Sequence, residues 1–337
     1  MQFGLSQEQI LLQDNVNRFL DDNSALDRVR TYADGGEDAD IWAGLAELGI
    51  PALLIPEAQG GIGLQPLDAA IVAECLGSHI APTPFLESAV MAPTALVASG
   101  GDHDELLAEI AAGTTRIGIA FGEAIKRRNN AGVTVKDGRM SGTSMYAFDA
   151  EANAYLVADQ HQHIYLVRAD DPGLKRSHLA TVDKTRRTVE LNYDNVTADL
   201  VSDDASVFTA TVDIGRMALA ADTLGAAQNM LDQAVEYAKQ REQFNRPIGS
   251  FQAVKHMCAE MAAQLEPCRS MVWFAGHALA ELPEESRITA CHTKAHLAEV
   301  GQFIAKTSTE VHGGMGFTDL VGLHYWFKRI GANRQWL

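Results

Sequence analysis

Two stretches of this sequence carry residue types that could bind a phosphate-bearing ligand. The first, YAKQREQFNRPIGSFQ, supplies a cation, an aromatic plate and a polar contact, namely Arg241, Phe244 and Gln252. The second holds two successive glycines, Gly313 and Gly314, whose uncovered backbone N–H groups would suit a pyrophosphate oxygen. An arginine that caps one helix and a glycine that ends another explain the same residues without a ligand. On spacing alone the cap is favoured for Arg241, and the glycines fit both interpretations.

Two histidine pairs have metal-compatible spacing, but neither has a further ligand nearby in the sequence. His161 and His163 lie two residues apart beside a predicted turn. His292 and His296 lie four apart on a predicted helix, as in zinc peptidases, but Thr293 follows the first histidine and no glutamate stands between them. We therefore expect a solvated hairpin and an ordinary helix face, and no metal site.

Composition restricts the class of partner. The 337 residues are 47% hydrophobic, enough for two or three domains. The 27 lysines and arginines against 44 aspartates and glutamates give a net charge of -17, which disfavours nucleic acids and anionic membranes. No apolar run approaches the roughly 20 residues of a membrane span, and no secretion signal is recognisable. The cysteines form no CxxC pair and indicate a reduced, cytoplasmic protein; they are Cys75, Cys258, Cys268 and Cys291.

The hydrophobic period changes twice along the chain. Helical patterns start after Ser6, which has capping-box spacing to Gln9. From about Arg116, short β-branched and aromatic runs alternate with turn residues, and Asp137-Gly138 stands where a tight hairpin needs positive φ. These runs predict a small antiparallel β domain.

Helical stripes return after about Ser206, and Pro267 is expected to kink or divide the second of the helices they predict. Such stripes indicate helices packed in a bundle. We predict an N-terminal helical domain over 1–112, a middle β domain over 113–206, and a C-terminal four-helix bundle over 207–337 that forms the oligomer interface.

The arginine-containing stretch, the later HGGMGF and this order of elements together resemble the acyl-CoA dehydrogenase family of flavoproteins. The resemblance covers essentially the whole chain: LSQEQILLQDNVNRFL is similar to the family's opening helix and PEAQGGIGL to its glycine-rich loop. It implies a mostly helical fold with a middle antiparallel β domain. It also implies a reaction in which a carboxylate removes the α proton of an acyl-CoA while flavin N5 takes the β hydride. The product would be a trans-2-enoyl-CoA, and the electrons would pass to an electron-transfer flavoprotein.

The resemblance further implies FAD at a subunit interface. One protomer holds the flavin ring, and its neighbour contacts the pyrophosphate and adenosine. Glu310 stands where the family usually has a glutamine, which weakens that contact. The positions that match the neighbour's set are Arg241, Phe244, Gln252, Gly313 and Gly314.

The positions that would hold the flavin ring match poorly. The family's Thr-Glu pair corresponds to Gly122-Glu123, and its Gly-Ser-Asp stretch to Lys126-Arg127-Arg128. This basic triplet could attract a CoA phosphate, but because it replaces a cofactor loop we favour a solvated turn or a partner contact. The family's Trp-Ile-Thr falls on Tyr146-Ala147-Phe148, and Phe148 offers no hydrogen bond to N5.

The catalytic carboxylate of the family is also missing. Counted ungapped from the glycine pair it falls on Leu337, and with a two-residue shift on Gln335. The family's other location corresponds to Gly215, before Arg216. None of these side chains can take a proton from carbon, and a positioned base contributes roughly 10²- to 10⁴-fold in rate. We therefore assign no catalytic residue to this chain.

The positions that contact the nucleotide match the family, whereas the ring contacts and the base are missing. We therefore predict that this chain is the second, base-lacking subunit of a two-plus-two heterotetramer with a longer, base-bearing paralogue. Some bacterial enzymes that resemble this chain, especially those acting on steroid side-chain thioesters, are assembled in this way. Two alternatives remain open. In the first, Asp222 or Asp213 acts as an unorthodox base in a homo-oligomer. Alternatively, the chain is a binding or structural protein that has lost the cofactor.

Overall fold

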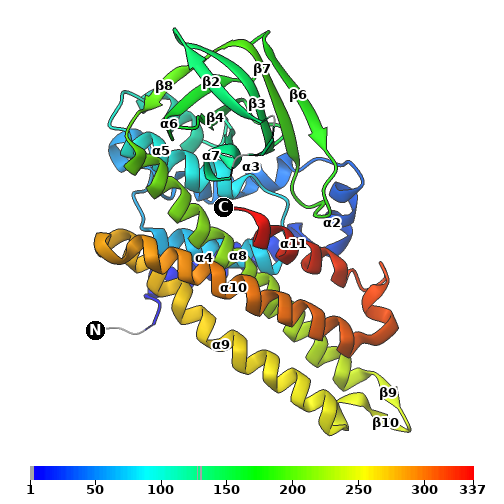
Figure 1. Cartoon of the computed structure of the whole chain (residues 1–337). Coiled ribbons are helices and arrows are strands. Elements are labelled where there is room, and N and C mark those ends of the chain that lie inside the picture. The colour runs from blue at the N-terminus through cyan, green and yellow to red at the C-terminus, as the bar shows by residue number, and fades with distance from the viewer. Residues whose placement is uncertain (1–3, 127, 130) are drawn as a thin grey trace. The chain divides into compact units, whose positions relative to one another are not determined.

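The computed structural model (Figure 1) describes residues 4–126, 128–129 and 131–337. Arg127, in the middle of the basic triplet, lies outside the described residues. The chain divides into two compact units, which we call the bundle unit and the β unit. The bundle unit comprises Met1–Gly36, Ala70–Ala81 and Arg216–Gln335. The β unit comprises Glu37–Ala69, Pro82–Gly215 and Trp336–Leu337.

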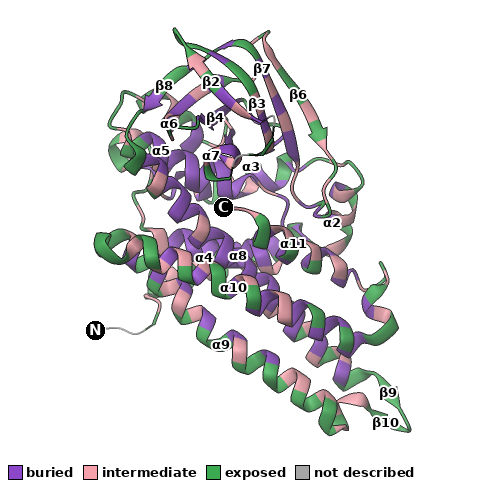
Figure 2. Ribbon diagram, viewed as in Figure 1, coloured by how far each residue is buried: buried purple, intermediate pink, exposed green. Residues whose placement is uncertain are grey.

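The bundle unit consists of helices whose apolar stripes face inward, as the buried residues in Figure 2 show. The first helix begins with the predicted capping box, in which Gln9 N donates to Ser6 Oγ at 3.1 Å and Ser6 N donates to Gln9 Oε1 at 3.0 Å. The unit contains α1 (Gln7–Asn23), α2 (Leu26–Ala33), α9 (Gln252–Glu281), α10 (Pro283–His312), α11 (Leu323–Gln335) and most of α4 (Pro66–Ser78) and α8 (Ala205–Gln240). Pro267 lies inside α9 and does not divide it. No helix among the described residues is long and apolar enough to cross a membrane.

Two four-stranded sheets form the centre of the β unit, in the orders β1-β4-β5-β8 and β2-β3-β7-β6. Their strands are β1 (Ile117–Ala120), β2 (Gly132–Lys136), β3 (Arg139–Phe148), β4 (Ala154–Ala158), β5 (Ile164–Arg168), β6 (Leu174–Leu179), β7 (Thr188–Thr197) and β8 (Asp199–Ser202). The pairs are antiparallel except β1 with β4, which is parallel. The predicted turn at Asp137-Gly138 joins β2 to β3, with φ of 52° and 71°.

Short helices complete the β unit. They are α3 (Ala39–Glu47), η1 (Ile50–Ala52), η2 (Glu57–Gln59), the π-helix η3 (Phe85–Met91), α5 (Ala92–Ala98), α6 (Asp104–Ala111) and α7 (Gly122–Ile125). Helix η3 is entirely buried. A π-helix is rare and often marks a functional site, so its side chains are considered below.

Strand β3 contains a bulge near its end. Ser144 pairs with Leu191 and Ala147 pairs with Val189, so β3 has one more residue than β7 between these two pairs. Within the bulge, Tyr146 has φ of 56°, a left-handed conformation that non-glycine residues adopt only where the surrounding structure requires it. The bulge sets the direction of the side chains at the family's Trp-Ile-Thr positions.

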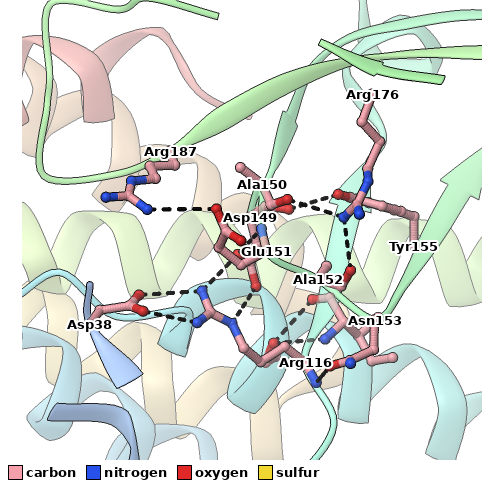
Figure 3. A network of polar contacts seen from close by, with 12 residues as sticks. Asp38, Arg116, Asp149, Ala150, Glu151, Ala152, Asn153, Tyr155, Arg176 and Arg187 are labelled. Carbon is pink, nitrogen blue, oxygen red and sulfur yellow. Dashed lines mark hydrogen bonds and ion pairs between the residues drawn. The ribbon is translucent and has the colours of Figure 1, made fainter. Parts of the chain in front are cut away.

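Arg116 joins three segments of the β unit (Figure 3). Its guanidinium donates to the Asp149 carboxylate at 2.8 and 2.7 Å and to the Asp38 carboxylate at 3.0 and 3.3 Å. Asp38 precedes α3, Arg116 precedes β1 and Asp149 follows β3. The Tyr155 hydroxyl donates to the Asp149 carbonyl oxygen at 3.0 Å. The network therefore fixes the end of β3, beside the bulge.

We expect Arg116→Met to lower the free energy of unfolding by about 3–5 kcal/mol, because it leaves two buried carboxylates without their cation. Arg334→Met is the matched control, since Arg334 pairs with Glu299 at the surface and should contribute at most about 1 kcal/mol. Urea denaturation of both variants measures the difference. Equal, small losses would contradict this account of Arg116.

Candidate functional site

Three of the predicted cofactor residues lie at the junction of α8 and α9. A two-residue turn joins β9 (Glu242–Gln243) to β10 (Arg246–Pro247), and its residues Phe244 and Asn245 have φ of 54° and 58°. Phe244 is 86% exposed, and Arg241 and Gln252 are also exposed. The hairpin is ordered by Phe251, whose ring packs edge-on to Phe244 at 6.1 Å and under the Arg246 guanidinium at 4.0 Å.

A stacked pair of rings connects this junction to the glycine pair. Tyr237 of α8 stacks on His312 of α10 with ring centroids 4.6 Å apart, and Arg241 N donates to the Tyr237 carbonyl at 2.8 Å. His312 Nδ1 lies 2.8 Å from the Ser308 carbonyl, and burial lowers the pKa of its imidazole. A neutral ring that donates through Nδ1 satisfies both observations.

Gly313 directly follows His312 and ends α10 with φ of 57°, as predicted for a helix stop. The glycine pair opens η5 (Gly313–Phe317). A Cβ added at Gly313 or at Gly314 would meet no atom within 4 Å, so the backbone is open to close approach by a ligand. All five sequence-predicted residues are thus exposed on segments joined through the Tyr237–His312 stack. We call this set, Arg241, Phe244, Gln252, Gly313 and Gly314, the nucleotide-side group.

The positions that would hold a flavin ring are engaged with one another in the β unit. Glu123, in α7 just after β1, pairs with Arg128 at 2.8 Å, and the Arg128 guanidinium lies 5.1 Å from the centre of the Tyr146 ring. Lys126 and Arg128 are exposed, as expected for a solvated turn, and Arg128 in addition forms this ion pair; Arg127 lies outside the described residues. Glu123 Oε2 is buried without a hydrogen-bond partner among the described residues.

Trp336 packs against the same positions. Its ring lies 4.6 Å from that of Phe148 and 6.0 Å from that of Tyr146. Phe148 is buried, and it presents no hydrogen-bonding group. We call Glu123, Arg128, Tyr146, Phe148 and Trp336 the ring-side group; Trp336 packs edge-on to Tyr146 and tilted against Phe148.

Two of the three positions inferred for the catalytic carboxylate, Gly215 and Leu337, lie next to each other in the structure. A Cβ added at Gly215 would lie 2.6 Å from Leu337 Cδ1 and 2.9 Å from Met91 Sδ, closer than real Cβ contacts. A side chain at Gly215 would therefore displace Leu337 or Met91. Gln335 is exposed. No carboxylate stands at any of the three positions.

Asp222, one of the alternative bases, is held by an ion pair in the bundle unit. Its Oδ2 accepts from Arg329 Nη2 at 2.6 Å, and its Oδ1 accepts from Arg329 Nε at 3.0 Å and from Asn333 Nδ2 at 2.6 Å. Both Asp222 and Arg329 are buried. A carboxylate engaged in this way serves the fold, which weighs against the alternative that it acts as a base. Asp213 is also buried.

We expect Asp222→Asn to lower the free energy of unfolding by about 3–5 kcal/mol, because the buried Arg329 guanidinium would lose its carboxylate. Asp232→Asn is the matched control on the same helix, where Asp232 is exposed, and should stay within about 0.5 kcal/mol of wild type. Thermal and urea unfolding provide the comparison. An Asp222→Asn protein as stable as the control would contradict the structural role.

Helix η3, which carries Met91, also buries a carboxyl group. Desolvation and the neighbouring Asp149 carboxylate raise the pKa of Glu87, whereas a backbone hydrogen bond, Arg186 and Arg116 lower it, and the net result is a pKa of about 8. At neutral pH Glu87 therefore retains its proton in the folded protein. The sequence signal for this group is a lone glutamate within the apolar run PFLESAVMAP.

The raised pKa makes a pH-dependent contribution to stability. Between about pH 4.5 and pH 8 the folded chain holds a proton on Glu87 that the unfolded chain releases, so this contribution falls as pH rises. We expect Glu87→Gln, which mimics the protonated form, to flatten the decline in urea-unfolding free energy over this interval. Glu47→Gln, at an exposed site of the same unit, should keep the wild-type slope. Parallel slopes for all three proteins would refute the assignment.

The part of the chain that the structure describes contains no group of three or more His, Cys, Asp or Glu residues able to hold a metal ion. Asp159 accepts hydrogen bonds from the backbone N–H groups of His161 and His163 at 2.8 and 3.0 Å, as befits a hairpin turn. His292 and His296 are both exposed on α10.

Sequence reasoning missed the residues that act across long separations. Trp336 gave no periodic signal, and Asp38 and Asp149 are single acidic residues whose common partner, Arg116, is distant in sequence. The Tyr237–His312 stack likewise joins two helices that spacing alone does not align.

Comparison with known proteins identifies relatives along the whole chain. A model of the acyl-CoA dehydrogenase N-terminal domain matches residues 6–114, and one of the C-terminal domain matches residues 205–336. Acyl-CoA dehydrogenase IpdE2 of Mycobacterium tuberculosis is 31% identical over 312 residues, which cover 92% of this chain and 86% of the relative. Acyl-CoA dehydrogenase FadE27 of the same organism is 31% identical over 307 residues, covering 86% and 82%.

Solved structures of two-component complexes are also similar. The ChsE4–ChsE5 complex from Mycobacterium tuberculosis superimposes with a TM-score of 0.90 at 27% identity, covering 99% of this chain and 94% of the matched chain. A variant of the Tcur3481–Tcur3483 steroid ACAD gives 0.88 at 28% identity, covering 97% and 92%. The fold predicted from the sequence, mostly helical with a middle β domain, is confirmed.

Proposed function

Because this chain belongs to the acyl-CoA dehydrogenase family, we propose that it is the base-lacking subunit of a heteromeric acyl-CoA dehydrogenase. In that role it completes the FAD site of a base-bearing paralogue. The observation that carries the proposal is the contrast between its two groups: the nucleotide-side group is exposed, whereas the ring-side group is filled and no carboxylate stands at the base positions. Family members are FAD-dependent enzymes that oxidise the CH–CH bond of acyl-CoA thioesters.

The nucleotide-side group fits the tail of FAD. Arg241 provides a cation for the pyrophosphate, and the open backbone at Gly313 and Gly314 allows N–H groups to approach its oxygens. Phe244 offers an aromatic face already in water, and Gln252 a polar contact at the start of α9. FAD, when bound, supplies the acceptor for the β hydride of the acyl chain. This chain's residues would hold its tail and fix its position.

The ring-side group does not fit the cofactor. Phe148 donates no hydrogen bond, and Trp336 already packs against both aromatic side chains of this group. The partner subunit must therefore supply both the ring contacts and the base. The similarity to the ChsE4–ChsE5 complex and to a steroid ACAD supports a heteromeric assembly and a bulky, steroid-like acyl group. We propose that the assembly is a two-plus-two heterotetramer that passes its electrons to an electron-transfer flavoprotein.

Co-expression with a base-bearing paralogue from the same genome tests the proposal. We expect the two chains to co-purify as a yellow complex that absorbs near 450 nm and converts an acyl-CoA to the enoyl-CoA, while this chain alone is colourless and inactive. A complex that is colourless, and so holds no FAD, would instead support a structural role for this chain. A yellow, active preparation of this chain alone would overturn the proposal.

Arg241→Gln should weaken FAD binding by the complex about 10- to 100-fold, because a hydrogen bond to a charged group contributes about 1.5–3 kcal/mol. Arg246→Gln is the control on the same hairpin, since the Arg246 guanidinium packs on Phe251. It should change the FAD dissociation constant by no more than a few-fold. Titration of apo-complex with FAD, followed by flavin fluorescence, gives both values. Equal losses of FAD affinity in the two variants would contradict a specific contact between Arg241 and FAD.

A further inference from the structure

Trp336 and Leu337 follow α11 in sequence but pack in the β unit. The Trp336 ring meets Phe148 at an interplanar angle of 52° and Tyr146 at 67°, and Arg128 lies over the Tyr146 ring. Both rings that receive Trp336 belong to the bulged end of β3. The bulge, with its left-handed Tyr146, thus presents two aromatic rings, and Trp336 packs against both of them, edge-on to Tyr146 and tilted against Phe148.

Leu337 fills the adjoining space. Its Cδ1 lies where a side chain at Gly215 would begin, next to Met91 of η3. Trp336 therefore packs against β3, and Leu337, the next residue, lies against η3 and against α8 at Gly215. We call these two residues the plug.

We propose that the plug fills a space in the β unit that would otherwise accept a flat aromatic ligand, so that this chain excludes such a ligand from its own ring-side group. The plug is part of the chain, so a free ligand competes with an intramolecular group whose effective concentration is on the order of millimolar. The proposed function supplies only the identity of that ligand, a flavin ring; the packing argument stands without it.

The test uses the full chain alone, without partner or thioester, and lumiflavin as the probe, because it carries the tricyclic ring without the nucleotide tail. Trp336→Ala should bind lumiflavin at least about 10-fold more tightly than wild type, as measured by quenching of lumiflavin fluorescence. Trp273→Ala, which removes another half-buried tryptophan from α9, should bind no better than wild type. Free indole should raise the thermal midpoint of Trp336→Ala and leave wild type unchanged, since a ligand of matching shape refills a vacated apolar space.

Three outcomes overturn the proposal: lumiflavin binds wild type as tightly as Trp336→Ala, Trp336→Ala binds neither probe, or it binds indole only and so lacks room for a flavin ring. Should Trp336→Ala not fold, Trp336→Leu keeps an apolar side chain and permits the same titration. Trp336→Phe should restore exclusion of lumiflavin. The result does not depend on whether the heteromeric complex holds FAD, so failure here and failure of the proposed function are separate observations.

Discussion

Each compact unit depends on an arginine that is largely shielded from water and forms ion pairs with carboxylates. In the bundle unit Arg329 is 2% exposed and binds Asp222 through two nitrogens. In the β unit Arg116 binds Asp38, which precedes α3, and Asp149, which follows β3. These two segments are far apart in sequence. Removing one partner of a buried pair leaves an uncompensated charge, and for this reason such groups are costly to substitute.

The same pairing limits the chemistry of the chain. A general base needs an ionised carboxylate with a lone pair directed at the substrate. Asp222 and Asp149 direct theirs at buried guanidinium groups, and Glu87 holds its proton at neutral pH. These carboxylates contribute to stability and orientation. The exposed nucleotide-side group differs from them, because its cation and open backbone are not consumed by packing within the bundle unit.

The elements were predictable where a local period exists. The capping box at Ser6, the hairpin at Asp137-Gly138 and the helix stop at Gly313 each depend on residues within a few positions of one another. Strand β6 was harder to predict, because most of its residues are polar or partly exposed and show no apolar alternation. Pro267 was expected to kink or divide α9, yet the helix continues as one element over 30 residues. The three-domain boundaries and the assignment of the five nucleotide-side residues to a cofactor stay predictions.

The candidate site was less predictable than the fold, since its decisive contacts join residues that no spacing relates. Counting along the sequence placed the missing carboxylate at Leu337 or at Gly215, as though these were separate gaps in a pattern. In three dimensions the two positions are neighbours, and the Leu337 side chain occupies the space that a side chain at Gly215 would need. A glutamate placed at Gly215 would meet Leu337 and Met91 before it met a substrate. The two missing-base positions are therefore one local feature of the β unit, and a carboxylate placed at Gly215 would require the side chains of Leu337 and Met91 to move.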